Sequence, residues 1–198
     1  MSDILEPGVF YHIYNRGNNK GNIFIEEKNY AYFLYLVSKH LTPACELYCY
    51  CLLKNHFHLL LRIKDFEELP AKLISEKNRL HQPFANLFNA YSKGINKVYK
   101  RSGSLFQKNF DRKRVTNESY LRSLILYIHL NPVKHGFIDD YTNYKHSSFQ
   151  TIMSDEPTDL KREEVIQFFE DKENFLFCHN LKKIKYDGII GEIDEMDI

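Results

Sequence analysis

The alternation of hydrophobic and polar positions predicts four short strands. Residues 9–14 alternate aromatic or aliphatic side chains with other residues, and residues 46–53 and 56–63 are two apolar runs joined at Lys54-Asn55. The length of these two runs favours a pair of antiparallel strands over one long helix. Residues 105–115 form the fourth strand candidate.

Three other segments show helical spacing. Apolar residues recur every three or four positions in Glu27–His40, Pro83–Lys100 and Glu118–Leu130, which predicts three helices with one buried face each. A proline disfavours the helical conformation of the residue before it. We therefore expect the last of these helices to stop at Asn131, directly before Pro132.

The order of these elements is strand, helix, strand, strand, helix, strand, helix, which is the split βαβ pattern. We predict an α+β fold of the ferredoxin-like or RRM-like kind, an antiparallel sheet with helices packed on one face. This domain is expected to span residues 1–150. Residues 151–198 are expected to form an acidic extension that is partly helical, with a helix around Leu160–Glu173 and a disordered end at residues 188–198.

The charge of the chain is divided near the same position. Residues 1–150 hold 21 Lys and Arg against 13 Asp and Glu, a net charge of +8, and residues 151–198 hold 6 against 13, a net charge of −7. A basic body suggests a polyanionic partner. No apolar run approaches the length of a membrane span, and the start MSDILEPGVF lacks the layout of a signal peptide. Secretion and membrane insertion are therefore not expected.

The sharpest local feature is the sequence His56-Phe57-His58. On a strand, the two histidines point to one face and Phe57 points to the other. Two imidazoles two residues apart can bind one metal ion, although a histidine in such a setting is often structural. The four cysteines form no C-x-x-C pair and are expected to be buried thiols.

Two further features indicate chemistry on nucleic acid. Tyr120, Tyr127 and Asn131 share a stripe beside the apolar face of the last predicted helix. A tyrosine at a core edge is most often a packing residue, but a tyrosine can also attack a phosphate and form a covalent intermediate. Between positions 93 and 114, eight basic residues stand against one acidic residue, with aromatic residues between them. This run favours nucleic acid over a merely solvated surface.

The chain resembles the single-tyrosine HUH transposases, and within them the REP-associated tyrosine transposases. Five blocks carry the resemblance, in the order that the family shows, over about residues 9–150. They are YHIYNRGNNKGNIF (11–24), KNHFHLLLR (54–62), GSLFQKNF (103–110), LYIHLNPVKHGF (126–137) and YKHSSFQ (144–150).

The resemblance implies roles for four residues. Tyr127 would be the nucleophile, and His56 and His58 would hold a divalent cation, Mg²⁺ or Mn²⁺. The third protein ligand of these enzymes lies one helical turn after the tyrosine, which here is Asn131, where relatives often carry Gln. Helix geometry agrees with this choice of tyrosine, because Tyr127 lies about 6 Å along the axis from Asn131 and Tyr120 about 16 Å.

The resemblance also implies the substrate. It would be single-stranded DNA with a palindromic hairpin, cleaved nearby to give a 5′-phosphotyrosine and a free 3′-hydroxyl, by a bacterial cytoplasmic protein that is nucleoid-associated when bound to DNA. Asn15 and Arg16 would contact DNA near the cleavage site, and the basic run would follow its backbone. Arg62 shares the face of the two histidines, and a phosphate contact and a structural role are both open for it. The residues of the basic run assigned to DNA are Lys100, Arg101, Lys108, Arg112, Lys113 and Arg114.

Three questions stay open at the level of sequence. The protein is expected to be either a monomer or a homodimer with swapped tyrosine helices. The first alternative function is a non-catalytic or domesticated protein that binds single-stranded nucleic acid, since ferredoxin-like sheets also host such domains. The second is a zinc hydrolase, which is disfavoured because no carboxylate or third histidine follows at a usual zinc-ligand spacing.

Overall fold

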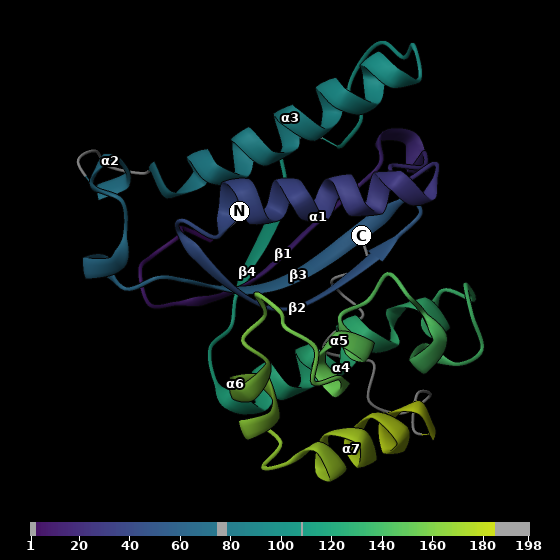
Figure 1. The fold of residues 1–198 in the computed structure, drawn as a ribbon. Helices are drawn as coiled ribbons and strands as arrows, with labels where there is room; N and C mark the ends of the chain where they lie inside the picture. The colour runs from purple at the N-terminus through teal and green to yellow at the C-terminus, as the bar shows by residue number, and fades with distance from the viewer. Residues whose placement is uncertain (1–2, 75–78, 108, 185–198) are drawn as a thin grey trace.

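The structure is a computed structural model that describes residues 3–74, 79–107 and 109–184. Its centre is an antiparallel sheet with the strand order β2-β3-β1-β4 (Figure 1). The strands are β1 (Phe10–Arg16), β2 (Cys45–Leu53), β3 (His56–Ile63) and β4 (Asp111–Arg114). Helix α1 (Glu27–Leu41) follows β1, and helix α3 (Gln82–Val98) follows β3 after the short helix α2 (Ala71–Ile74). This is the split βαβ arrangement, so the predicted α+β fold is confirmed.

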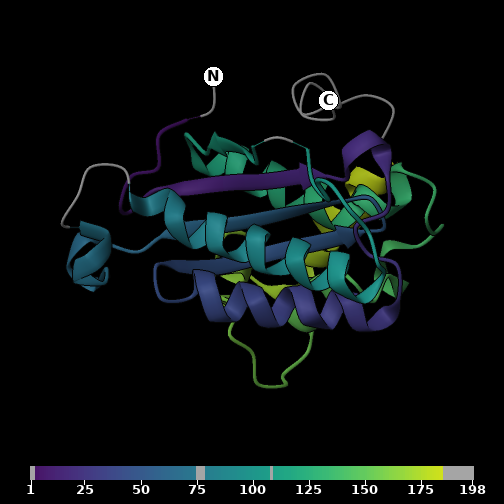
Figure 2. The same ribbon diagram turned by 90° about the horizontal axis from the view of Figure 1, so that it is seen from above.

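Helices cover both faces of the sheet. Helices α1 and α3 lie side by side on one face (Figures 1 and 2), and four later helices lie on the other side of the sheet. These are α4 (Glu118–Lys134), α5 (Phe149–Met153), α6 (Arg162–Gln167) and α7 (Lys172–Ile184). The prediction of helices on one face was wrong in this respect. The physical reason is visible in β3, where Leu59 and Leu61 face one core and Leu60 faces the other.

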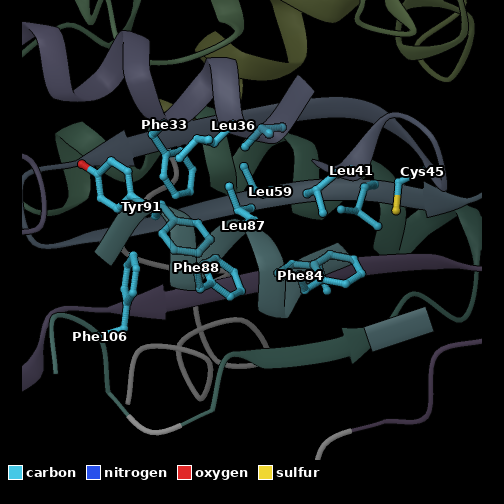
Figure 3. Close-up of a cluster of buried hydrophobic side chains, with 14 of the residues drawn as sticks. Phe33, Leu36, Leu41, Cys45, Leu59, Phe84, Leu87, Phe88, Tyr91 and Phe106 are labelled. Atoms are coloured by element: carbon cyan, nitrogen blue, oxygen red, sulfur yellow. The ribbon is translucent and has the colours of Figure 1, made fainter. Parts of the chain in front are cut away.

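The first core fills the space between the sheet and the pair α1 and α3. Leucine and aromatic side chains make up most of it, and Phe33, Leu59 and Tyr91 are fully buried there (Figure 3). The hydroxyl of Tyr91 donates a hydrogen bond to the carbonyl of Ile23 at 2.8 Å, so the polar end of this ring is satisfied inside the core. This core fixes β1 and β3, the two central strands, to one another.

The second core joins the sheet to the acidic part of the chain. Val165, Phe169 and Phe175 are buried there together with residues of α4 and β2. The segment after residue 150 is therefore part of the folded domain, with α6 against β2 and α7 against α4. The prediction of a single helix at Leu160–Glu173 was wrong, because α6 ends at Gln167 and the chain turns before α7 begins at Lys172. Residues 188–198 lie outside the described residues.

Helix α4 continues through Pro132 to Lys134. The predicted end at Asn131 was wrong, because Pro132 removes a single N–H donor and the residues after it still donate back into the helix. The N–H of His135 still donates to the carbonyl of Asn131 at 3.1 Å, and Gly136, at φ +66°, closes the helix. Asn131 therefore keeps its helical relation to the residue four positions earlier.

Strand β4 is shorter than the predicted run of residues 105–115. Only Asp111–Arg114 pair with β1, whereas Phe106 forms an isolated bridge to Gly17. Asn109 adopts a left-handed conformation at φ 60°, which interrupts the extended chain between them.

Of the helices in the described ranges, none combines the length and the apolar character that crossing a bilayer requires.

Candidate active site

The structure brings Tyr127, His56, His58 and Asn131 together on the α4 side of the sheet. Nε2 of His56 lies 3.1 Å from Oδ1 of Asn131. The ring centroids of His56 and His58 are 5.3 Å apart, and those of His58 and Tyr127 are 5.5 Å apart. All four side chains are buried. The roles assigned to them stay predictions, and the structure shows that the four side chains are neighbours.

Local structure explains this convergence. His56 and His58 are alternate residues at the start of β3, so both point to the same face. Tyr127 and Asn131 are four residues apart on α4, so they lie one turn apart on one stripe. The start of α4 is fixed by Asn117, whose side chain accepts a hydrogen bond from the N–H of Tyr120 at 2.8 Å.

The hydrogen bonds of His56 test whether a cation fits here. Nδ1 of His56 lies 2.7 Å from Oδ1 of Asn55, and an amide oxygen only accepts, so Nδ1 carries the proton. In the neutral imidazole, Nε2 then presents a lone pair to Oδ1 of Asn131, which is also an acceptor. Two lone pairs that face each other can both bind one divalent cation placed between them.

Asn131 supports the same interpretation. Its Nδ2 is buried and has no hydrogen-bond partner in the described part of the chain, so the amide is not fully satisfied by protein groups. Among these residues no group of three or more His, Cys, Asp or Glu side chains could hold a metal ion. A cation here would have two imidazoles and the amide oxygen of Asn131 as its protein ligands, a set that fits Mn²⁺ or Mg²⁺ with the remaining positions left to water or substrate.

His12 is a residue of this cluster that the sequence did not indicate. It is fully buried on β1, and its Nε2 lies 2.9 Å from Nδ1 of His58. Its ring also lies 6.3 Å, edge to face, from that of Tyr127. The alternation of residues 9–14 does give the face of His12 within its own strand. It does not give the register that pairs Tyr14 with His58 and brings the two histidines together.

Two residues at the end of α4 were also missed. Nζ of Lys134 lies 5.2 Å from the ring centroid of Tyr127, and the ring of His135 lies 4.9 Å from that of His56. Both follow Pro132, beyond the predicted end of the helix. A helix that continues for one more turn returns Lys134 to the side of Tyr127.

Comparisons with known proteins found similar proteins in sequence and in fold. No family model matches the chain. A curated protein of Haemophilus influenzae named REP-associated tyrosine transposase is 24% identical over 150 residues, which cover 69% of this chain and 84% of that protein. A solved structure of a REP-associated tyrosine transposase bound to a REP hairpin matches 77% of this chain and 86% of that chain, with a TM-score of 0.58 and 14% identity.

The chain resembles the REP-associated tyrosine transposases. The resemblance predicted from the motifs is thereby confirmed by a relative in sequence and by a match in fold.

The second tyrosine of the stripe differs from Tyr127 in its environment. Burial raises the pKa of Tyr120 to about 12, and nearby Tyr14 and Asp3 add to this shift. Nζ of Lys113, on β4, lies 5.7 Å from its ring centroid. A phenol with a raised pKa is a poorer nucleophile at neutral pH. Of the two tyrosines considered for the transposase-like chemistry, Tyr127 is the one beside the histidines.

Arg16 and Asn15, for which the transposase resemblance implies DNA contacts, lie at the end of β1. Arg16 is the register partner of His56, and its Nε is buried with no hydrogen-bond partner in the described part of the chain. Asn15 points to the opposite face and lines a groove of about 770 Å³ beside α3. Amide and aromatic side chains also line this groove, and they are Phe88, Asn89, Phe106, Gln107, Asn109 and Phe110.

The other basic residues assigned to DNA lie in two places. Lys100 and Arg101 are exposed just after α3, and Arg112, Lys113 and Arg114 lie on the edge strand β4. Arg114 forms an ion pair with Glu6 at 2.7 Å. Lys108 lies outside the described residues.

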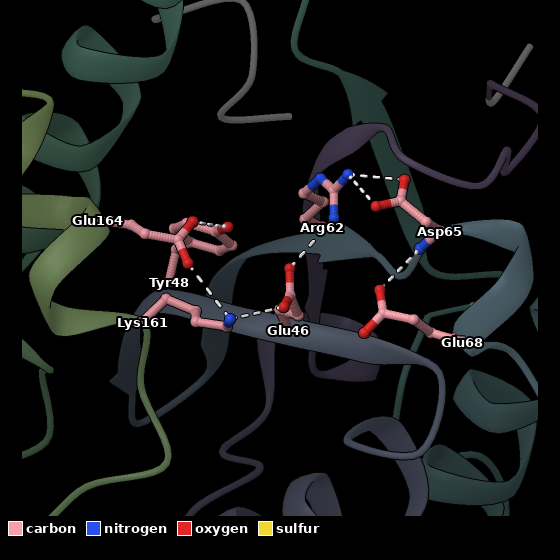
Figure 4. A network of polar contacts seen from close by, with 7 residues as sticks. All are labelled: Glu46, Tyr48, Arg62, Asp65, Glu68, Lys161 and Glu164. Carbon is pink, nitrogen blue, oxygen red and sulfur yellow. Dashed lines mark hydrogen bonds and ion pairs between the residues drawn. The ribbon is translucent and has the colours of Figure 1, made fainter.

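Arg62 lies away from the site, near the opposite end of β3. Its guanidinium pairs with Asp65 at 2.8 Å and with Glu46 at 3.3 Å (Figure 4). Glu46 in turn pairs with Lys161, at 2.7 Å, in the segment before α6. Of the two roles left open for Arg62, this network favours the structural one.

A second pair of buried histidines lies deeper in the second core. Nδ1 of His129 lies 2.9 Å from Nε2 of His179, and Nε2 of His129 lies 2.8 Å from the hydroxyl of Ser148. Nδ1 of His179 lies 2.7 Å from the carbonyl oxygen of Phe175. These contacts tie α4 to α7 and to the start of α5.

Proposed function

We propose that this chain cleaves and rejoins single-stranded DNA at hairpin-forming sequences, in the manner of a DNA transposase. The observation that carries the proposal is the convergence of Tyr127 with His56, His58 and Asn131 in one buried cluster. The names of the two similar proteins support a transposase-type function, and one of them is bound to a REP hairpin.

The proposed reaction is a transesterification. The hydroxyl oxygen of Tyr127 attacks a phosphodiester phosphorus, a bond forms between them, and the bond from phosphorus to the 3′-oxygen breaks. The 5′-phosphate stays on Tyr127, and the 3′-oxygen takes up a proton and leaves as a hydroxyl. A 3′-hydroxyl that attacks the phosphotyrosine reverses these steps and joins two strands, so no outside energy source is needed.

Residues around the nucleophile support this step. The ammonium of Lys134, 5.2 Å from the ring centroid of Tyr127, stabilises negative charge as the hydroxyl loses its proton. Arg16, beside His56, has a buried donor available for a phosphate oxygen. A divalent cation held by His56, His58 and Asn131 would polarise the phosphate and neutralise the charge that develops on it.

The basic surface supports single-stranded DNA as the partner. Backbone phosphates would lie along β4 and the end of α3, where Lys113, Lys100 and Arg101 are placed. The groove at Asn15 presents amide groups and aromatic rings, which suit unpaired bases. All four residues of the proposed chemistry come from one copy of the chain, so a single copy holds every side chain that the proposed step uses.

A denaturing-gel assay tests the proposal. The protein is incubated with labelled single-stranded oligonucleotides from palindromes that flank its own gene, with Mn²⁺ or with chelator. We expect a covalent band that needs Mn²⁺, is lost completely in Tyr127→Phe and is kept in Tyr120→Phe. A band that survives Tyr127→Phe would show that another residue is the nucleophile. Tight binding without any covalent band would favour the non-catalytic binding protein.

A further inference from the structure

His12 makes a contact that no role has so far explained. Its imidazole is fully buried on a central strand, and its Nε2 lies 2.9 Å from Nδ1 of His58. The two rings are nearly parallel, with an interplanar angle of 21° and centroids 5.1 Å apart. A buried imidazole must be matched by its surroundings, since an unsatisfied polar group in a core is costly. The hydrogen-bond partner of His12 is His58, a residue of the proposed metal site.

The contact between the two imidazoles couples their protons. A hydrogen bond between Nε2 of His12 and Nδ1 of His58 needs the proton on one nitrogen and the lone pair on the other. If Nδ1 of His58 carries the proton, Nε2 of His58 keeps its lone pair and can bind a cation. Nε2 of His12 is then the acceptor of that bond and cannot itself bind the same cation.

We propose that His12 is a positioning residue that holds His58 in the Nδ1–H tautomer and turns its Nε2 toward the cation. This inference rests on the metal site of the proposed function. Partners of this kind set the tautomer and the ring orientation of metal-binding histidines in general. The chain uses an imidazole here in place of the more common carboxylate or carbonyl oxygen.

The surroundings of His12 suit this role. The strand β1 lies between β3 and β4 in the sheet, so its backbone is held on both sides. The ring of Tyr14 stacks on that of His12 at 4.7 Å. A side chain with fixed neighbours can in turn fix the ring that it contacts. His12 also lies edge to face with Tyr127, so one side chain contacts both a ligand and the proposed nucleophile.

The first test is the affinity of the full chain for Mn²⁺, measured by titration calorimetry without DNA. The two variants compared with the wild type are His12→Phe, which fills the space without a nitrogen, and His12→Gln, which keeps a polar atom near the position of Nε2. We expect Mn²⁺ binding to weaken by about 10- to 100-fold in His12→Phe and by only a few fold in His12→Gln. Equal affinities in a folded His12→Phe protein and in the wild type would overturn the proposal.

The second test uses the wild type alone and so does not depend on the folding of a variant. Nitrogen-15 NMR of the metal-free protein distinguishes the two tautomers of His58. A proton on Nδ1 is expected, and a proton on Nε2 would overturn the proposal. The gel assay tests DNA cleavage, whereas the calorimetric titration of His12→Phe tests Mn²⁺ binding without DNA. The proposed function and the role of His12 can therefore fail independently. If the wild type binds no Mn²⁺, the role of His12 is refuted together with the metal site.

Discussion

Two pairs of buried histidines share the same contact but differ in what lies at their ends. The rings of His12 and His58 meet at 2.9 Å, and so do those of His129 and His179. The second pair is closed by protein groups at both ends, by the carbonyl of Phe175 and the hydroxyl of Ser148. In the first pair, the ring of His58 lies beside those of His56 and Tyr127, in the cluster that also contains Asn131.

The closed pair has one consistent arrangement of protons. The carbonyl of Phe175 only accepts, so Nδ1 of His179 carries a proton and its Nε2 accepts from Nδ1 of His129. Nε2 of His129 then accepts from the hydroxyl of Ser148. Every ring nitrogen of this pair is used within the protein. The same imidazole contact therefore has different neighbours in the two pairs, a carbonyl and a hydroxyl in one and the proposed catalytic residues in the other.

The largest expected difference between the two histidine pairs is the loss of stability when the pair His129 and His179 is broken. The variant His179→Leu leaves Nδ1–H of His129 buried without an acceptor, and we expect unfolding in urea to show a loss of about 3 kcal/mol. Mn²⁺ affinity should stay within twofold of the wild type. The matched control is Phe177→Leu on the exposed face of the same helix, where the loss should be below about 0.5 kcal/mol.

The outcome that contradicts this comparison is a loss of Mn²⁺ affinity in a folded His179→Leu protein. The second pair would then act on the metal site through α4, and the division into a structural and a functional pair would be wrong. His12→Phe should behave differently from His179→Leu, since it is expected to weaken Mn²⁺ binding by up to about 100-fold.

A second, smaller effect is expected from pH. Burial lowers the pKa of His179 to about 4, whereas an unfolded histidine titrates near 6.5. The unfolded chain therefore takes up a proton as the pH falls through 6.5, and the native protein does not until near pH 4. This contribution to stability is complete above pH 6.5 and is lost between pH 6.5 and pH 4. Between pH 7 and pH 5 we expect a loss of about 2 kcal/mol.

Urea unfolding at a series of pH values measures this loss. The buried neighbour His129, whose pKa burial also lowers, adds to the slope in the same direction. In His179→Leu the slope should decrease, because one of the two groups no longer titrates. An identical slope in the variant and the wild type would show that His179 does not carry the effect.

The sequence predicted more of the His56, His58, Asn131 and Tyr127 cluster than of the residues that support it. Alternation placed His56 and His58 on one face, and helical spacing placed Asn131 one turn after Tyr127, because both relations depend only on local geometry. The contact of His12 with His58 depends on the register of β1 against β3. That register is set by packing between residues 46 positions apart in the chain.

The strand pattern in the sequence does indicate that helices cover the second face of the sheet. Residues 56–63 are a nearly continuous apolar run, and such a run is typical of a strand buried on both faces. The acidic composition of residues 151–198 masked the apolar residues that cover this face, among them Val165, Phe169 and Phe175. Net charge describes the surface of a segment and does not exclude a buried face on it.

The smallest expected effect concerns Arg62, at the end of the sheet away from the histidines. In Arg62→Gln, Glu46 still pairs with Lys161 at 2.7 Å (Figure 4), so we expect stability to fall by only about 1 kcal/mol. Binding of a hairpin oligonucleotide, measured by fluorescence anisotropy at low salt, should stay within twofold of the wild type. The matched variant Lys113→Gln, on the edge strand, should weaken binding severalfold, because its ammonium is placed to contact a phosphate. If Arg62→Gln weakens DNA binding as much as Lys113→Gln does, this end of the sheet belongs to the DNA surface, and the ion pairs of Arg62 must open when DNA binds.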